Sequence, residues 1–269
     1  MSNQKKADEG KFTLAFAALA IPVCVLAGII IYSFILGSPA NFEEGNTENH
    51  PINMLGIVYK GGVIVPILVS VLLIILTFSI ERFITIGKAK GKGSVEKFVI
   101  NTRQLLANGQ VDDAIAACDV QKGSVANVIK NGLSKYKIVE ADASMDKESK
   151  LVAIQKDIEE ATSLELPMLS KNLVIISTCA SIATLIGLIG TVVGMIRAFQ
   201  ALAQAGSPDA TALSTGISEA LINTFLGISG SAIAIVMYNY FSTKIDSLTY
   251  SIDEAGYSIV KTFDTKHNK

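Results

Sequence analysis

The sequence is poor in the side chains that most often build a metal or catalytic centre. Its 269 residues include no tryptophan and only two histidines, His50 and His267, both in polar segments. Of the three cysteines, Cys24 and Cys179 lie in apolar runs and Cys118 lies in the central polar region. No pair of cysteines has metal-ligand spacing, so they are predicted to be small buried hydrophobic residues. A catalytic or metal site built on histidine is not indicated.

The chain also lacks a large net charge of either sign, because 23 Lys and Arg residues against 24 Asp and Glu residues give a formal net charge of −1 at pH 7. The basic residues sit at the flanks of apolar runs rather than in one patch. This distribution excludes the electrostatic footprint of a nucleic-acid-binding protein. No nucleic-acid partner and no cofactor are expected.

Apolar residues are abundant, at 50% of the chain, and they are gathered in blocks. About 20 helical residues span the roughly 30 Å of hydrocarbon in a bilayer. Four runs are long enough: Phe12–Leu36, Gly62–Ile86, Asn172–Ala203 and Thr215–Phe241, the last two joined by a short polar loop, Gln204–Ser214. The sequence therefore predicts an all-α membrane protein with four transmembrane helices.

The first run could instead be a signal peptide, because lysines precede it and Ser38-Pro39-Ala40 loosely resembles a cleavage site. Its apolar core is about 25 residues long, against about 7–15 in a signal peptide. A retained helix is therefore favoured, and Pro22 is expected to kink it.

Basic residues beside membrane helices mark the cytoplasmic side. Lysines precede the first run and follow the second and the fourth, whereas the loop between the first two runs is acidic. Both termini are therefore predicted to lie inside. The same argument places Asn46 and Asp209 outside and Lys92, Lys150 and Lys266 inside.

The polar middle of the chain reads as helices extending the membrane bundle into the cytoplasm, over about residues 88–170. Helical spacing of apolar residues predicts Val95–Asn108, Val111–Asp119, Ser124–Tyr136 and Leu151–Glu165, with Pro167 kinking or restarting the last helix. The tail Ser242–Phe263 keeps the same spacing, so the fourth membrane helix should continue beyond the membrane. A helical repeat is the alternative, but there is no second copy of the unit. No catalytic or nucleotide-binding motif appears here.

The third run has three faces on an ideal helix of 100° per residue. One is a hydroxyl stripe of Ser177, Ser181, Thr184 and Thr191. Beside it lies a stripe of small residues suited to close helix packing: Ala183, Gly187, Gly190 and Gly194. The remaining face, which includes Leu185, Ile189, Val192 and Ile196, is predicted to meet lipid or large side chains. Arg197, near the outer end, is expected to reach headgroups or a partner's carboxylate.

The fourth run carries Glu219, with Asn223 and Gly230 on the same face and Gly216 and Gly227 flanking that face. These glycines are expected to leave room for a partner helix. Thr224 points about 140° away from Glu219. It reaches a depth similar to that of Thr191, so the two threonines could approach each other.

Small and hydroxyl residues alone would be explained by helix packing. A carboxylate is different, because an acidic residue at mid-membrane costs about 2.5–3.5 kcal/mol on insertion scales and usually faces a bundle interior or a wet cavity. Desolvation disfavours the charged form of a carboxyl group, which suits Glu219 to taking up and losing protons.

Two stretches together resemble the paired signature of the ExbB/TolQ proton-channel family, within the wider MotA/TolQ/ExbB group. They are Gly187-Leu-Ile-Gly190-Thr191-Val-Val-Gly194 and Gly216-Ile-Ser-Glu219-Ala-Leu-Ile-Asn-Thr224. Glu81-Arg82-Phe83 and Met237–Phe241 also resemble that family. The resemblance covers roughly residues 62–245. It divides the chain into an extra helix and acidic loop, 1–61, and an ExbB/TolQ-like domain, 62–269, whose membrane motif pair occupies 171–241.

The resemblance implies a bacterial inner-membrane protein that forms a ring, thought to be a pentamer, around a single-helix partner like ExbD or TolR. Proton flow would then drive motion passed to a TonB-like protein, with membrane lipid around the ring. Glu219 matches the family's intramembrane glutamate, and Thr191 and Thr224 match its two pore-associated threonines. Ser177, Ser181, Thr184, Asn223 and Arg197 are possible pore-lining or partner contacts.

The chain departs from the family at three positions. Thr184 and Ile233 stand where the family often has proline, and Asn223 stands where a small apolar residue is common. These differences concern helix kinks and pore polarity.

The sequence therefore predicts a subunit that converts proton-motive force into work, and not an enzyme. A TolQ-like or MotA-like motor for envelope integrity or motility is the near alternative. Alternatives of another class are a proton-coupled secondary transporter, for which inverted repeats and interrupted helices are lacking, and a non-conducting scaffold.

Overall fold

The computed structural model describes residues 2–204 and 210–267, where the chain is helical and has no strand beyond one bridge between Phe42 and Pro51. The α-helices are α1 (Ser2–Ile30), α2 (Met54–Tyr59), α3 (Val65–Lys90), α4 (Val95–Ala107), α5 (Val111–Gln121), α6 (Gly123–Ala141), α7 (Lys147–Ser170), α8 (Leu173–Gln204) and α9 (Ala210–Lys266). Four helical stretches are long and apolar enough to cross a membrane. The predicted class, a multi-pass helical membrane protein, is confirmed.

The chain forms two compact units. The first comprises Met1–Ile80 and Asn172–Asn239, and the second comprises Glu81–Lys171 and Tyr240–Lys269. Helices α3 and α9 contribute residues to both units.

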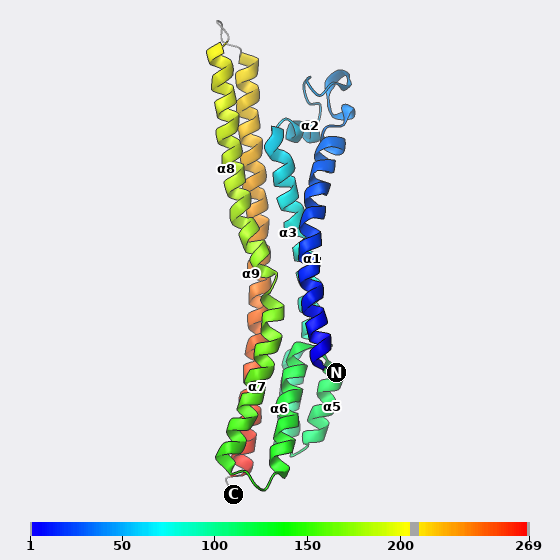
Figure 1. Ribbon diagram of the computed structural model, residues 1–269, viewed down its shortest axis with the longest axis vertical. Helices are drawn as coiled ribbons and strands as arrows, with labels where there is room; N and C mark the ends of the chain where they lie inside the picture. The colour runs from blue at the N-terminus through cyan, green and yellow to red at the C-terminus, as the bar shows by residue number, and fades with distance from the viewer. Residues whose placement is uncertain (1, 205–209, 268–269) are drawn as a thin grey trace. The chain divides into compact units, whose positions relative to one another are not determined.

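In the first unit, α8 and the adjoining part of α9 lie side by side as an antiparallel hairpin (Figure 1). Helix α1 packs on α3 through an edge-on contact between the rings of Phe16 and Phe78, 6.0 Å apart, and a 3.5 Å contact between Cys24 Sγ and Thr77 Oγ1. Helix α1 runs through Pro22 and ends in a π-helical turn, Ile31–Leu36.

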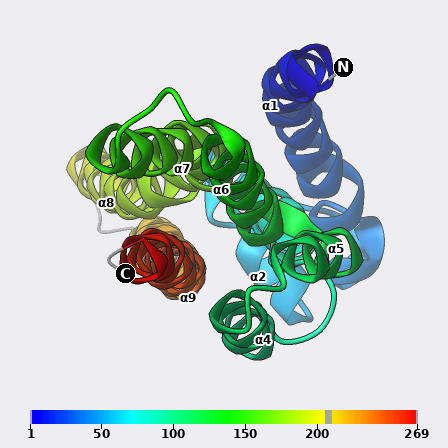
Figure 2. The same cartoon turned by 90° about the horizontal axis from the view of Figure 1, so that it is seen from below.

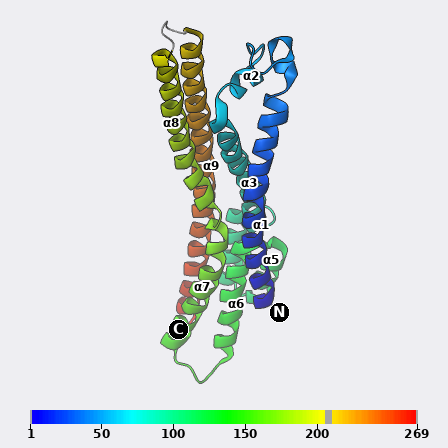
Figure 3. The ribbon, with the colours of Figure 1, turned by 45° about the horizontal axis from the view of Figure 1, so that its top comes forward.

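The segment between α1 and α3 is an ordered loop containing short 3-10 turns, Pro39–Asn41, Glu43–Gly45 and Gly62–Ile64, and α2 (Figure 3). Asn41 Nδ2 donates to the carbonyls of Ile35 and Leu36, at 2.7 and 2.8 Å, and so satisfies the end of the π-helical turn. The rings of Tyr32 and Tyr59 stack with centroids 4.7 Å apart. Side chains therefore fix the loop in place.

The second unit contains α4 to α7 and the end of α9 (Figure 2). The expected apolar positions of α7 and of the tail are buried except for Leu151, which is half-buried. The buried ones are Ile154, Ile158, Ala161, Ile245, Leu248, Ile252 and Ile259. Helix α9 continues to Lys266, so the predicted extension of the fourth helix is confirmed. Helix α7 runs through Pro167 and ends at Ser170, and α8 begins at Leu173.

A buried arginine ties α3 to the end of α7 within the second unit. Arg82 is 0% exposed and makes a two-point ion pair with Glu81, at 2.6 and 2.5 Å. Arg82 Nη1 also donates to the carbonyls of Leu169, at 2.9 Å, and Met168, at 3.4 Å. These carbonyls belong to the last turn of α7, where a cation is favoured by the helix dipole. The pairing of Glu81 with Arg82 expected from the sequence is present.

Several predicted boundaries were wrong. Helix α6 runs to Ala141 rather than Tyr136, and α7 covers Lys147–Ser170 rather than Leu151–Glu165. The loop expected over Gln204–Ser214 was wrong at both ends, because Gln204 still belongs to α8 and residues 210–214 already belong to α9. Alanine and leucine are among these residues, and both favour helix. Asp209 lies outside the described residues, so its predicted position stays a prediction.

Candidate functional site

Glu219 lies on α9 and pairs with Arg197 of α8 in the same chain. The distance between Arg197 Nη1 and Glu219 Oε1 is 2.6 Å. The Glu219 side chain is 8% exposed, whereas the Arg197 side chain is 49% exposed. Burial of the carboxylate was expected. The pair within the chain was not predicted for Arg197, and its expected contact with headgroups or a partner's carboxylate stays a prediction.

A tight turn at Gly61–Gly62, here called the outer turn, covers the carboxylate. Gly62 has a φ of +76°, and a Cβ atom there would lie 2.2 Å from Glu219 Oε1. Both the left-handed backbone and the lack of space require glycine. The sequence analysis did not identify Gly62, although its position at the start of an apolar run was visible.

Asn223 holds the outer turn from one helical turn further along α9. Its Nδ2 donates to the carbonyl of Gly61 at 2.8 Å, and the residue is 0% exposed. Its Oδ1 has no hydrogen-bond partner among the described residues. Gly190 makes room for it, since a Cβ there would lie 2.4 Å from the Cβ of Asn223. Asn223 therefore has an internal role in this chain, besides any contact with a partner.

Thr191 and Thr224 meet across the hairpin through a hydrogen bond between their hydroxyl oxygens. Each hydroxyl also lies within bonding distance of a carbonyl one turn back, Thr191 with Gly187 at 3.2 Å and Thr224 with Ala220 at 3.1 Å. A hydroxyl has a single proton to donate. The threonine that donates across the hairpin therefore gives up its bond to its own helix, and either one can do so. The predicted approach of these residues is confirmed.

Small residues bring the two helices together. A Cβ on Gly194 would lie 2.8 Å from Ala220 N, and one on Gly216 would lie 2.7 Å from Ala198 Cβ. Gly187 and Gly227 face each other, since a Cβ on either would lie 2.8–3.0 Å from the Cα of the other. The space expected for a partner helix at Gly216 and Gly227 is thus filled by α8 of the same chain.

Gly230 differs from the other glycines of the hairpin. The nearest atom to an added Cβ is Ala183 Cβ at 3.6 Å, which is ordinary van der Waals contact. Its assignment as a residue of close helix packing is therefore not supported by its surroundings.

The hydroxyl stripe of α8 opens into a groove, here called the hydroxyl groove, with a volume of about 350 Å³. It is lined by Ser177, Ala180, Ser181, Thr184, Ser231, Ile235 and Tyr238. The sequence analysis missed Ser231 and Tyr238. They follow Thr224 at intervals of seven residues, so a projection centred on Thr224 would have placed all three on one face.

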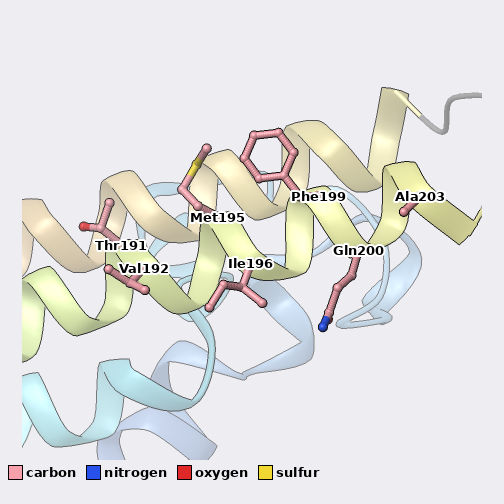
Figure 4. A pocket seen from close by; sticks show the side chains of 7 residues that line it. All are labelled: Thr191, Val192, Met195, Ile196, Phe199, Gln200 and Ala203. Atoms are coloured by element: carbon pink, nitrogen blue, oxygen red, sulfur yellow. The ribbon is translucent and has the colours of Figure 1, made fainter.

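The lipid-type face predicted for α8 is exposed, with Leu185 at 59% and Val192 at 56%. Further along α8, a shallow apolar pocket of about 540 Å³ is lined by Thr191, Val192, Met195, Ile196, Phe199, Gln200 and Ala203 (Figure 4). All seven come from one helix, and Met195 and Phe199 point to the opposite side from Ile196 and Gln200. The pocket is a feature of the helix surface rather than an enclosed cavity.

Comparison with known proteins points to the same residues. The sequence model of the MotA/TolQ/ExbB proton channel family matches residues 121–254, about half of the chain. This stretch contains Arg197, Glu219, both threonines and the hydroxyl groove.

Similar curated proteins carry related names. The Tol-Pal system protein TolQ of Pseudomonas aeruginosa is 27% identical over 124 residues, which is 46% of this chain and 54% of that protein. The biopolymer transport protein ExbB of Salmonella typhimurium is 29% identical over 85 residues, 32% of this chain and 35% of that protein.

A putative ExbB-like protein of Helicobacter pylori is 36% identical over 97 residues, 36% of this chain and 64% of that protein. The matched stretch thus spans about half the length of the first curated relatives. On the family match and these relatives, the chain belongs to the MotA/TolQ/ExbB proton channel family.

Proposed function

We propose that the chain is the proton-conducting motor subunit of a bacterial inner-membrane complex that uses proton-motive force to energise outer-membrane transport through a TonB-like protein. In this proposal it forms a ring, expected to be a pentamer, around an ExbD/TolR-like single-helix partner. It performs no covalent chemistry. The observation that carries the proposal is a buried carboxylate, Glu219, in a glycine-packed hairpin that also holds a threonine pair and the hydroxyl groove.

The polar groups of α9 are spaced through the depth of a bilayer. Glu219, Thr224, Ser231 and Tyr238 follow one another along the helix, and at 1.5 Å per residue Glu219 and Tyr238 are about 28 Å apart. The hydrocarbon core is about 30 Å thick. Glu219 would exchange protons near the outer side. The threonine pair and the hydroxyl groove, on a different face of α9, would line the path towards the inner side.

The driving force is sufficient for mechanical work. One charge crossing 100 mV releases about 2.3 kcal/mol, so a few protons supply a conformational step. Because TolQ proteins are among the relatives, an envelope-integrity motor of the TolQ type is the second candidate.

The test replaces Glu219 by glutamine in a deletion strain that expresses the chain and its neighbouring partner genes. Glu254→Gln, an exposed glutamate on the same helix, is the matched control. We expect Glu219→Gln to abolish proton-driven work while the complex still copurifies, and Glu254→Gln to retain it. Full work in Glu219→Gln would reduce Glu219 to a scaffold role and remove the proposed mechanism.

The same strains distinguish which process the motor energises. Loss of uptake of iron carriers under iron limitation would favour the TonB-linked function, whereas sensitivity to detergent and to bulky antibiotics with intact uptake would favour the TolQ-like function. Loss of motility alone would favour a MotA-like function.

We further propose that both termini face the cytoplasm, since the basic flanks of the apolar runs favour that orientation. Single cysteines at Asn46 and at Lys150 test this with an impermeant thiol reagent in whole cells. Labelling at 46 and protection at 150 are expected. The reverse pattern would overturn the orientation.

A further inference from the structure

The ion pair between Arg197 and Glu219 places a permanently charged group directly on the carboxylate that the proposed function uses. The groups near this carboxylate come from every element packed around it. Arg197 of α8 binds it, the outer turn covers it, Asn223 lies one turn further along α9, and the Tyr32 hydroxyl lies within electrostatic range. Of these groups only Arg197 carries a positive charge.

We propose that Arg197 is an internal counter-ion that holds Glu219 charged and occluded, and that proton uptake by Glu219 releases it. Arg197 would thus be a positioning residue of the channel. This inference rests on the proposed function, because it assigns a role within the same site. In the occluded state the guanidinium pairs with Oε1 of the carboxylate, and Gly62 blocks access from the outer turn.

The unequal burial of the two partners determines which one moves. Glu219 is 8% exposed and lies beside the outer turn, whereas Arg197 is 49% exposed at the end of a long flexible side chain. A proton on Glu219 removes the negative charge that attracts the guanidinium. Arg197 can then swing to water or headgroups while its stem stays on apolar surface. Once the proton has left, return of the guanidinium restores the ion pair.

The outer turn gives the arrangement a fixed cover. The carbonyl of Gly61 is held by Asn223 at 2.8 Å, so the backbone over Glu219 is tied to the helix that carries it. Access therefore depends on the movable arginine rather than on the glycine turn.

The test measures protonation of Glu219 directly with dicyclohexylcarbodiimide, which adds to a protonated carboxyl group in an apolar site and leaves a covalent adduct. The full complex in native membranes is treated at pH 7, and the adduct at Glu219 is quantified by peptide mass spectrometry. Arg197→Gln should raise the labelling rate at least 10-fold, because a desolvated carboxyl group without its cation favours the protonated form. Arg197→Lys should keep the slow rate of the unmodified chain.

Two controls define the result. Glu219→Gln should give no adduct at this position, and Arg103→Gln, at an exposed arginine of α4, should leave the rate unchanged. Equal rates in the unmodified chain and in Arg197→Gln would overturn the counter-ion role, as would fast labelling in Arg197→Lys. If Arg197→Gln does not assemble, Arg197→Met carries the same expectation. Failure of both to assemble, with Arg197→Lys intact, would show a purely structural pair and also count against the proposal.

The outcome is independent of the test of function. Unchanged labelling in Arg197→Gln together with loss of work in Glu219→Gln would reject the counter-ion and keep the motor. Faster labelling in Arg197→Gln with full work in Glu219→Gln would keep the electrostatic role and reject the motor.

Discussion

Two glycines of α9 provide a matched test of how tightly the hairpin is packed. At Gly227 an added Cβ would lie 2.6 Å from the carbonyl oxygen of Ala183 and 2.8 Å from Gly187 Cα. Both atoms are backbone, so relief requires the helices to separate. At Gly230 the nearest atom would be 3.6 Å away. Gly227→Ala and Gly230→Ala therefore make the same chemical change in opposite surroundings.

Two contributions determine how much each substitution changes the free energy of unfolding. Replacing a helical glycine by alanine favours the helix by about 0.5–1 kcal/mol, and this gain applies to both variants. Overpacking a close contact costs about 1–3 kcal/mol, and only Gly227→Ala incurs it. Because the propensity term cancels, the free energies of unfolding of the two variants should differ by about 1–3 kcal/mol, with Gly230→Ala at or above the parent protein.

A native cysteine reports the unfolding. Cys179 on α8 is 8% exposed, so its alkylation in mixed micelles of increasing SDS content follows loss of the hairpin. Replacing Cys24 and Cys118 by alanine leaves it as the sole reporter. Gly227→Ala should shift the midpoint to lower SDS content. Equal midpoints for Gly227→Ala and Gly230→Ala would show that the contact at Gly227 relaxes without cost, and would refute the reasoning.

Three further outcomes are expected in the second unit. Lys122 has a φ of 57° and a ψ of −179°, a region that favours glycine, so Lys122→Gly should stabilise the chain by about 1–3 kcal/mol in thermal unfolding. The control Lys137→Gly, on the surface of α6, should lose about 1–2 kcal/mol, because it adds a helical glycine and removes an exposed ion pair with Asp112. Arg82→Met should lower the free energy of unfolding by about 3–5 kcal/mol, because Glu81 keeps its charge without its arginine. Arg82→Lys should restore little of that stability, since lysine cannot form two parallel hydrogen bonds with the carboxylate. Burial raises the pKa of the Cys118 thiol to about 12, so thiolate is scarce at pH 8. Iodoacetamide should therefore modify Cys118 only after unfolding. Rapid modification of the folded chain at pH 8 would contradict this expectation.

Much of the fold follows from local pattern. Runs of apolar residues predicted the membrane helices, and the 3.6-residue spacing of Ile252 and Ile259 predicted the buried face of the α9 extension. Thr191 and Thr224 could be brought together because antiparallel helices that start at one loop match in depth. Periodicity thus predicted both the elements and one long-range contact.

The contacts around Glu219 were not predictable in the same way. Which side chain meets Arg197 depends on the angle at which α8 and α9 cross. A helical projection treats each helix separately and gives no information on that angle. Gly62 belongs to a third element whose docking is set by a backbone conformation rather than by an apolar pattern. Projection placed Gly230 on the face with Glu219, but it could not show that the neighbouring helix stands further away at that level.

The absence of proline from α8 and α9 bears on how the proposed proton path would be built. Thr184 and Ile233 stand where the family resemblance implies proline. Helices α8 and α9 contain no proline over Leu173–Gln204 and Ala210–Lys266. Uninterrupted helices keep their backbone groups bonded to one another, so they offer few free carbonyls or amides to a proton path. Polarity inside the hairpin must then come from side chains. The buried Asn223, the exchangeable threonine pair and the hydroxyl groove supply it at successive depths along α9. In a hairpin without proline the polar groups are therefore side chains, and Asn223, which stands where the resemblance implies a small apolar residue, is the clearest instance.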